Sequence, residues 1–244
     1  MAMVHELEKS GTWLFRRRSW LPITVIALAV GYIFIANRSA IFFNYTYEII
    51  FVAVSLLGEV IRSYTVGYVP RNTSGRNIIE QLADQLNTTG VYSVVRNPLY
   101  IGNFFMWLGP VLFLRSVWCV IIFVLAYWLY YERIIFAEEQ FLRRKFGETY
   151  DQWTFKVKAI IPSFRNYIRS ELPFSFRNVL KREYNSITNV FIVFTVLDII
   201  RNLAITGKIY VEPLYISMLI AAAIFWCILR YLVKRTNFLN VEGR

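Results

Sequence analysis

Histidine is almost absent from this sequence: its 244 residues include one, His5. Catalysis by Ser-His or Cys-His pairs and metal sites built from several histidines are therefore excluded from the body of the chain, and we expect no metal. Cysteine is also scarce. Cys119 and Cys227 lie inside apolar runs, so the sequence predicts no disulfide framework.

Several common signatures are missing as well. There is no G-x-G-x-x-G fingerprint of a dinucleotide-binding domain and no repeat of fixed period. The first apolar run is long enough to span a membrane and lacks a small-residue cleavage site, so we expect no cleaved signal peptide. The net charge is +11, but no basic groove or nucleic-acid motif accompanies it, and we expect no nucleic-acid partner.

Hydrophobic residues, in contrast, are abundant. They make up 57% of the chain, above the roughly 45–50% of soluble domains, and they gather in blocks close to the thickness of a bilayer. The sequence predicts an all-α, polytopic membrane protein with about six transmembrane helices. The expected spans cover residues 20–36, 43–64, 100–114, 117–131, 187–205 and 214–232.

The distribution of Lys and Arg predicts the topology. With both termini and the loops 62–99 and 132–186 in the cytoplasm, the opposite side holds only Arg38, Arg115 and Lys208. We therefore expect an integral membrane protein with cytoplasmic termini, in the inner membrane of a bacterium or the endoplasmic reticulum of a eukaryote. Residues 78–86 suggest a short helix within the polar loop.

Charged residues also occur inside the predicted spans, where they are normally paired or functional. Glu59 and Arg62, and likewise Asp198 and Arg201, are three residues apart and can meet on one helix face. The simpler interpretation is a structural ion pair in each span. The alternative places Glu59 or Arg62 in the wall of a polar pocket.

The stretch from residue 90 to 150 carries the most chemistry. Pro98 breaks the chain before a new helix, so Arg96 is expected at a helix entrance, where its planar fork can bind a carboxylate or phosphate. We expect the helix that contains Glu138 and Glu139 to continue to Trp153, and on this helix the two carboxylates flank an apolar face. Unless they belong to a solvated charged face, these carboxylates need a positive partner, either Arg96 or a cationic cofactor.

Two motifs in this stretch resemble the isoprenylcysteine carboxyl methyltransferase and phospholipid methyltransferase superfamily. The first motif consists of Gly90, Tyr92, Arg96, Asn97, Pro98, Tyr100 and Gly102. The second consists of Glu138, Glu139, Leu142, Phe146, Gly147 and Tyr150, and Ile161-Pro162 close the region. The resemblance covers about residues 55–163. The two motifs together are a specific signal, whereas either motif alone would be a weak one.

The resemblance implies an integral membrane enzyme that binds S-adenosyl-L-methionine in a cofactor pocket at the cytosolic face, with Arg96 and Glu139 in catalytic positions. The cofactor-binding positions that it implies are Tyr92, Arg96, Asn97, Pro98, Leu99, Tyr100, Gly102, Glu138 and Glu139. Asn97 replaces the histidine of the family motif. An asparagine can orient a cofactor by hydrogen bonds, but it cannot act as a base near neutral pH.

These observations predict methyl transfer to a lipidic substrate taken from the bilayer. Without a histidine base, an anionic oxygen such as a carboxylate or lipid phosphate is the expected acceptor. The alternatives are a nicotinamide-dependent membrane reductase of related fold and a non-catalytic lipid-binding or transport protein. We expect three parts, residues 1–86, the methyltransferase core 87–165, and residues 166–244, whose two spans could support an oligomer.

Overall fold

The computed structural model of the chain describes residues 2–36, 41–70, 73 and 83–244. Over these residues the chain is helical and contains no strand, which confirms the predicted class. Eight α-helices and two short 3-10 helices follow in order: α1 Ala2–Arg16, α2 Trp20–Ile35, α3 Tyr45–Tyr68, η2 Gly90–Ser93, α4 Pro98–Phe113, α5 Val117–Phe146, α6 Glu148–Lys156, η3 Phe164–Asn166, α7 Phe176–Thr206 and α8 Pro213–Arg235.

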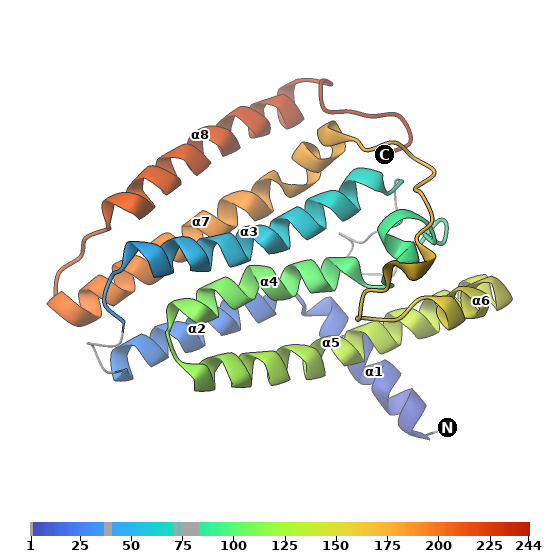
Figure 1. Cartoon of the computed structure of the whole chain (residues 1–244), viewed down its shortest axis with the longest axis horizontal. Coiled ribbons are helices and arrows are strands. Elements are labelled where there is room, and N and C mark those ends of the chain that lie inside the picture. Colours follow the sequence, from blue (N-terminus) through green and yellow to red (C-terminus); the bar gives the residue numbers. More distant parts are fainter. Residues whose placement is uncertain (1, 37–40, 71–72, 74–82) are drawn as a thin grey trace.

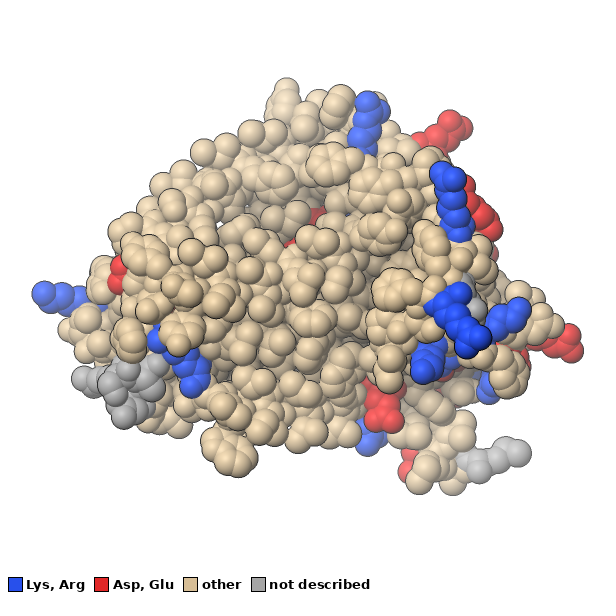
Figure 2. Space-filling model, viewed as in Figure 1, with Lys and Arg blue, Asp and Glu red and all other residues tan. Residues whose placement is uncertain are grey.

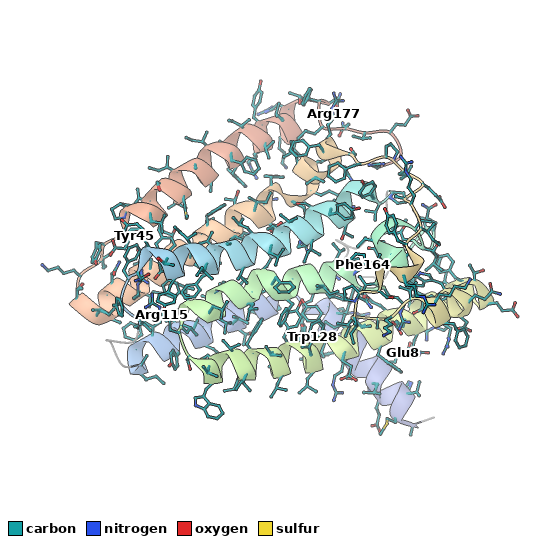
Figure 3. All side chains as sticks on the ribbon, in the orientation of Figure 1. Glu8, Tyr45, Arg115, Trp128, Phe164 and Arg177 are labelled. Atoms are coloured by element: carbon teal, nitrogen blue, oxygen red, sulfur yellow. The ribbon has the colours of Figure 1, made fainter. Side chains whose placement is uncertain are left out.

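Helix α3 is the centre of the bundle. It packs along α4 on one side and α7 on the other, while α8 covers α7 and α5 lies beyond α4 (Figure 1). Both termini, α6 and η2 lie at one end of the long axis, which we call the motif end (Figure 1). Phe164 lies at the motif end, and Arg115 lies at the opposite end (Figure 3).

Four helices are long and apolar enough to cross a bilayer: α3, α5, α7 and α8. Helices α2 and α4 are apolar, but each has 16 residues, fewer than the roughly 20 that a perpendicular span requires. Helix length thus confirms four of the six expected spans. In Figure 2, uncharged side chains cover the middle of the molecule, and most of the visible Lys and Arg side chains gather at the motif end.

Local sequence explains where several helices begin and end. Asn44 caps α3 by accepting hydrogen bonds from the amides of Thr46 and Tyr47, at 3.1 and 3.3 Å. Pro98 is the first residue of α4, a position where its missing N–H costs nothing. The expectation of one helix continuing to Trp153 is wrong. Gly147 has φ +55°, a conformation that suits glycine, and it separates α5 from α6.

A buried charged network holds the end opposite the motifs. Arg201 bonds to Asp198, as predicted, and also to Glu48 Oε1 at 2.6 Å. The hydroxyl of Tyr215 donates to Glu48 Oε2 at 2.5 Å. Since α3, α7 and α8 each contribute to this network, it fastens the last two helices to the rest of the bundle.

The N-terminal segment forms a helix, α1, that the sequence analysis did not predict. Gly11 and Phe15 of α1 are buried, and a Cβ at Gly11 would lie 2.0 Å from the carbonyl oxygen of Arg133 on α5. This close approach explains a glycine inside the helix. The helix expected at 78–86 lies mostly outside the described residues, and its described part, 83–86, is not helical.

Candidate active site

The first motif forms a turn that is bonded to a distant segment of the chain. Gly90 has φ +61°, and its amide donates to the carbonyl of Ile168 at 2.8 Å. The amide of Ile168 in turn donates to Ser93 Oγ at 2.9 Å. The amide of Arg96 donates to the carbonyl of Lys158 at 2.9 Å. These bonds join the turn to the chain that follows α6.

Arg96 connects this turn to both α5 and α6. Its Nε and Nη2 lie 3.0 and 2.8 Å from Glu139 Oε1. Its Nη1 donates to the carbonyls of Thr154 and Val157, at 3.2 and 2.9 Å. The Arg96 and Glu139 side chains are 15% and 25% exposed, so the ion pair is partly shielded from water. Because most of its five donors are used here, Arg96 is built to hold Glu139 in place.

Glu138 points to a neighbouring group of tyrosines. Its Oε2 accepts a hydrogen bond from the Tyr100 hydroxyl at 2.8 Å. The Tyr127 hydroxyl donates to the backbone carbonyl of Tyr100 at 2.7 Å, and the rings of Tyr100 and Tyr131 are 4.6 Å apart. The acidic pair is therefore divided: Glu139 meets the arginine, and Glu138 meets a phenol in an aromatic wall.

The other residues of the first motif have different surroundings. The Asn97 side chain donates to the carbonyl of Ala159 at 3.1 Å. Pro98 and Leu99 form the first turn of α4, with Pro98 buried. Gly102 lies where α4 crosses α3: a Cβ there would be 2.6 Å from Arg62 Cγ and 2.9 Å from the carbonyl oxygen of Gly58. Close helix packing thus accounts for Gly102 without a ligand.

Two more tyrosines lie near the acidic pair, Tyr92 within electrostatic reach of Glu138 and Tyr150 within reach of Glu139. The carbonyl of Tyr92 accepts a hydrogen bond from Trp153 Nε1 at 3.1 Å. Burial raises the pKa of the Tyr92 phenol. Burial also raises the pKa of the Tyr150 phenol, and the charge of Glu139 raises it further. The Tyr150 hydroxyl is buried and has no hydrogen-bond partner among the described residues, so it is free to bind a ligand.

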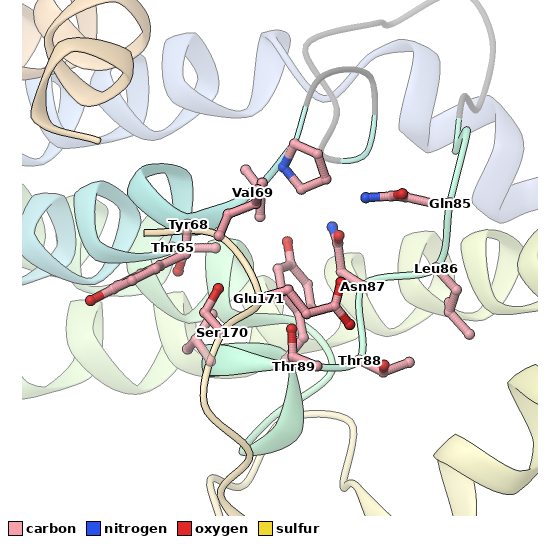
Figure 4. A pocket seen from close by; sticks show the side chains of 14 residues that line it. Thr65, Tyr68, Val69, Gln85, Leu86, Asn87, Thr88, Thr89, Ser170 and Glu171 are labelled. Atoms are coloured by element: carbon pink, nitrogen blue, oxygen red, sulfur yellow. The ribbon is translucent and has the colours of Figure 1, made fainter. Parts of the chain in front are cut away.

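A polar pocket opens beside Tyr92, with an empty volume of about 540 Å³ that includes open solvent. Figure 4 shows Thr65, Asn87, Thr89 and Ser170 around it. It lies between the end of α3, the turn and the segment after α6.

The expected ion pair between Glu59 and Arg62 is wrong, because Arg62 pairs with a residue of α7. Its Nε and Nη2 donate to Glu183 Oε2 at 3.1 and 2.8 Å, and its Nη1 donates to Asn103 Oδ1 at 2.5 Å. Glu183 and Asn103 were not among the candidate residues from the sequence. A charged residue in the first turns of α7 could have marked Glu183 as a candidate, but sequence spacing cannot show which distant helix its side chain contacts.

Comparison with known proteins agrees with the two motifs. Residues 52–149 match the family model described as phospholipid methyltransferase. Protein-S-isoprenylcysteine O-methyltransferase of Tribolium castaneum is 31% identical over 115 residues, covering 47% of this chain and 41% of the relative. The protein of the same name from Schizosaccharomyces pombe is 33% identical over 108 residues, covering 43% and 45%.

One of the similar proteins is not named as a methyltransferase. The nickel-cobalt-cadmium resistance protein NccN of Alcaligenes xylosoxydans xylosoxydans is 31% identical over 120 residues, covering 49% of this chain and 55% of the relative. The chain thus spans about half the length of the relatives it matches. No solved structure is significantly similar to it. Residues 52–149 are therefore similar to the isoprenylcysteine and phospholipid methyltransferase superfamily, in agreement with the resemblance found in the sequence.

Proposed function

We propose that this protein transfers a methyl group from S-adenosyl-L-methionine to an anionic oxygen of a lipid, a carboxylate or a phosphate. The observation that carries the proposal is the Arg96–Glu139 ion pair at 2.8 Å. This pair unites the two motifs shared with the superfamily in one partly buried, charged cluster. The proposal goes beyond the family match, because it names the methyl donor and the chemical class of the acceptor.

The residues present fit this cofactor. Its sulfonium and ammonium groups are cationic, and Glu138 and Glu139 supply carboxylates beside an aromatic wall that includes Tyr100. The Tyr150 hydroxyl has no partner within the described part of the chain, so an acceptor atom of the cofactor would complete its hydrogen bonding. The polar pocket beside Tyr92 offers further room. Of the remaining predicted cofactor residues, Asn97, Pro98 and Leu99 stay part of the proposed site through the shape of the turn, and Gly102 contributes through the close packing of α4 against α3.

Arg96 acts in this proposal mainly through Glu139. Its fork bonds to the carboxylate and to two backbone carbonyls at once, which fixes the carboxylate before any ligand arrives. A carboxylate held in advance loses little freedom on binding a cation, and this favours both affinity and alignment. Arg96 is thus a positioning residue, and Glu139 and Glu138 are the groups that touch the cofactor.

The reaction asks little covalent chemistry of the protein. When bound, S-adenosyl-L-methionine supplies a methyl group on a positively charged sulfur. Transfer to an anionic oxygen forms a C–O bond, breaks the C–S bond and leaves a neutral thioether, and no proton is moved. Such an in-line displacement depends on alignment and on exclusion of water. An asparagine at position 97, which cannot serve as a base, is compatible with this reaction.

The membrane setting follows from the same arrangement. We place the motif end, where Figure 2 shows most of the visible basic side chains, at the cytosolic face, with both termini in the cytoplasm. The lipid acceptor would enter sideways from the bilayer between helices. The last two helices are proposed to complete the lipid groove or to support an oligomer.

The proposal is tested by incubating membranes that contain the protein with methyl-labelled cofactor and identifying labelled lipids by mass spectrometry. We expect label on a carboxylate or phosphate oxygen, and none with a Glu138→Gln, Glu139→Gln double variant. Label on an amine would contradict the acceptor class. Absence of labelled lipid, together with reduction of a lipid by a nicotinamide cofactor, would favour the reductase alternative.

A further inference from the structure

A second charged cluster lies inside the bundle, apart from the Arg96–Glu139 pair. Glu59 of α3 is 3% exposed, and neither of its carboxyl oxygens has a hydrogen-bond partner among the described residues. The polar and charged groups that face it are Ser186 and Glu183 of α7 and Arg62 of its own helix. Glu59 lies nine residues before the end of α3, about 14 Å from that end at 1.5 Å per residue.

The neighbours of Glu59 are directed to other partners. Arg62 gives two N–H groups to Glu183 and one to Asn103, which leaves two of its five donors outside these bonds. The Ser186 hydroxyl lies 4.0 Å from the Met106 sulfur, and its contact with Glu59 does not reach hydrogen-bond geometry. The positive charge of Arg62 is therefore paired directly with Glu183, and it acts on Glu59 without forming an ion pair with it.

This environment makes a negative charge on Glu59 costly. Burial away from water penalises a carboxylate, and the second carboxylate, Glu183, adds repulsion. A neutral carboxyl group carries one O–H donor. That donor has no acceptor among the described residues, and the two unused donors of Arg62 lie in the same cluster. Buried donors without acceptors are rare in proteins, so a ligand oxygen is the missing partner.

Side chains of α4 and α5 link this cluster to the motif end. Asn103, which accepts from Arg62, also interacts with the Tyr131 hydroxyl. The ring of Tyr131 is 4.6 Å from that of Tyr100, whose hydroxyl bonds to Glu138. Contacting residues thus connect Glu59 with the proposed methyl-donor site, a placement suited to the acceptor.

We propose that Glu59, as a neutral hydrogen-bond donor, and Arg62 bind an anionic headgroup oxygen of the lipid acceptor. The inference rests on the proposed function and adds the residues that select the acceptor. Helix α7 contributes Glu183 and Ser186 to this subsite although it lies outside residues 52–149, the part that matches the family model. Headgroup selection therefore depends on a helix that the family match does not include.

Two single-chain amphiphiles that differ only in headgroup test the proposal: oleate, a carboxylate, and oleylamine, an ammonium. Their binding to the full chain in a neutral detergent is measured by calorimetry for wild type, Glu59→Gln, Glu59→Leu and the control Glu132→Gln, which changes an exposed carboxylate on α5. We expect wild type to prefer oleate. Glu59→Gln keeps a hydrogen-bond donor, so its affinity for oleate should stay within about threefold of wild type. Glu59→Leu has no donor, and its affinity for oleate should fall about tenfold, the equivalent of one hydrogen bond.

Three results would overturn the inference: unchanged oleate affinity in Glu59→Leu, a tenfold loss of oleate affinity in Glu59→Gln, or a preference of the wild type for oleylamine. The last result would show that Glu59 binds a cation as a charged carboxylate. If Glu59→Leu does not fold, the glutamine variant decides alone. S-Adenosyl-L-methionine affinity is measured on the same samples and should be equal in all variants. If wild type binds oleate as expected but no cofactor, the proposed function fails and the headgroup subsite stands.

Discussion

Arg96 and Glu139 are 43 residues apart in the chain, yet the guanidinium of Arg96 lies 2.8 Å from the Glu139 carboxylate. The same guanidinium donates to the carbonyls of Thr154 and Val157. One side chain therefore joins the turn before α4, the end of α5 and the end of α6. The proposed cofactor site depends on this junction, and the predictions below test its parts separately.

Replacing Arg96 by Lys should lower cofactor affinity at least tenfold and reduce thermal stability. A lysine keeps the charge but cannot bond to Glu139 and to both carbonyls at once. Calorimetric titration and thermal unfolding in detergent measure the two effects. The control is Arg143→Lys, since Arg143 pairs with Asp151 at 2.7 Å but is 55% exposed. Equal behaviour of the two variants would show that the fork of Arg96 has no special role.

Glu138→Gln should weaken cofactor binding about tenfold with little effect on stability. The amide oxygen can still accept the Tyr100 hydrogen bond, which measures 2.8 Å in the wild type, but the negative charge is lost. The matched control, Glu132→Gln, removes an exposed carboxylate from the same helix. If both variants bind the cofactor like wild type, Glu138 does not face a cation.

Tyr150→Phe should separate folding from binding. The hydroxyl is buried and has no partner among the residues that the structure describes, so its removal should leave the free energy of unfolding unchanged or raise it by about 1 kcal/mol. Cofactor affinity should fall about five- to tenfold, because the proposed ligand contact is lost. A clear loss of stability in the absence of ligand would contradict the assignment, since it would imply an existing partner for the hydroxyl.

Gly102→Ala should destabilise the protein by about 1–3 kcal/mol. Its Cβ would lie 2.6 Å from Arg62 Cγ and 2.9 Å from the Gly58 carbonyl oxygen, so α3 and α4 would have to separate. Gly31→Ala on α2 is the control, as nothing lies within 4 Å of its added Cβ. Thermal unfolding of both variants compares them. Equal unfolding temperatures would refute a packing role for Gly102.

Much of the fold could be predicted from the sequence because its causes are local. Apolar runs located the helices, Pro98 marked the start of α4, and the three-residue spacing of Asp198 and Arg201 predicted a pair that the structure confirms. The break at Gly147 was missed, since one glycine with φ +55° can end a helix that its neighbours would continue.

The partners of charged side chains could not be predicted in the same way. Glu59 and Arg62 have the spacing of an ion pair, but tertiary packing brings Glu183 of α7 to within 2.8 Å of Arg62. Sequence spacing describes one helix face and is silent about the helix that packs against it. In contrast, the meeting of Arg96 with the acidic pair was expected, because a helical hairpin returns the chain to the surface it left.

Titration of the purified protein with S-adenosyl-L-methionine and with its demethylated product in a calorimeter tests the central claim most directly. We predict saturable binding of both compounds to one site in the wild type, weakened about tenfold by Glu138→Gln and by Arg96→Lys. No heat with either compound, or equal affinity in wild type and both variants, would contradict a methyl-donor site at the Arg96–Glu139 junction.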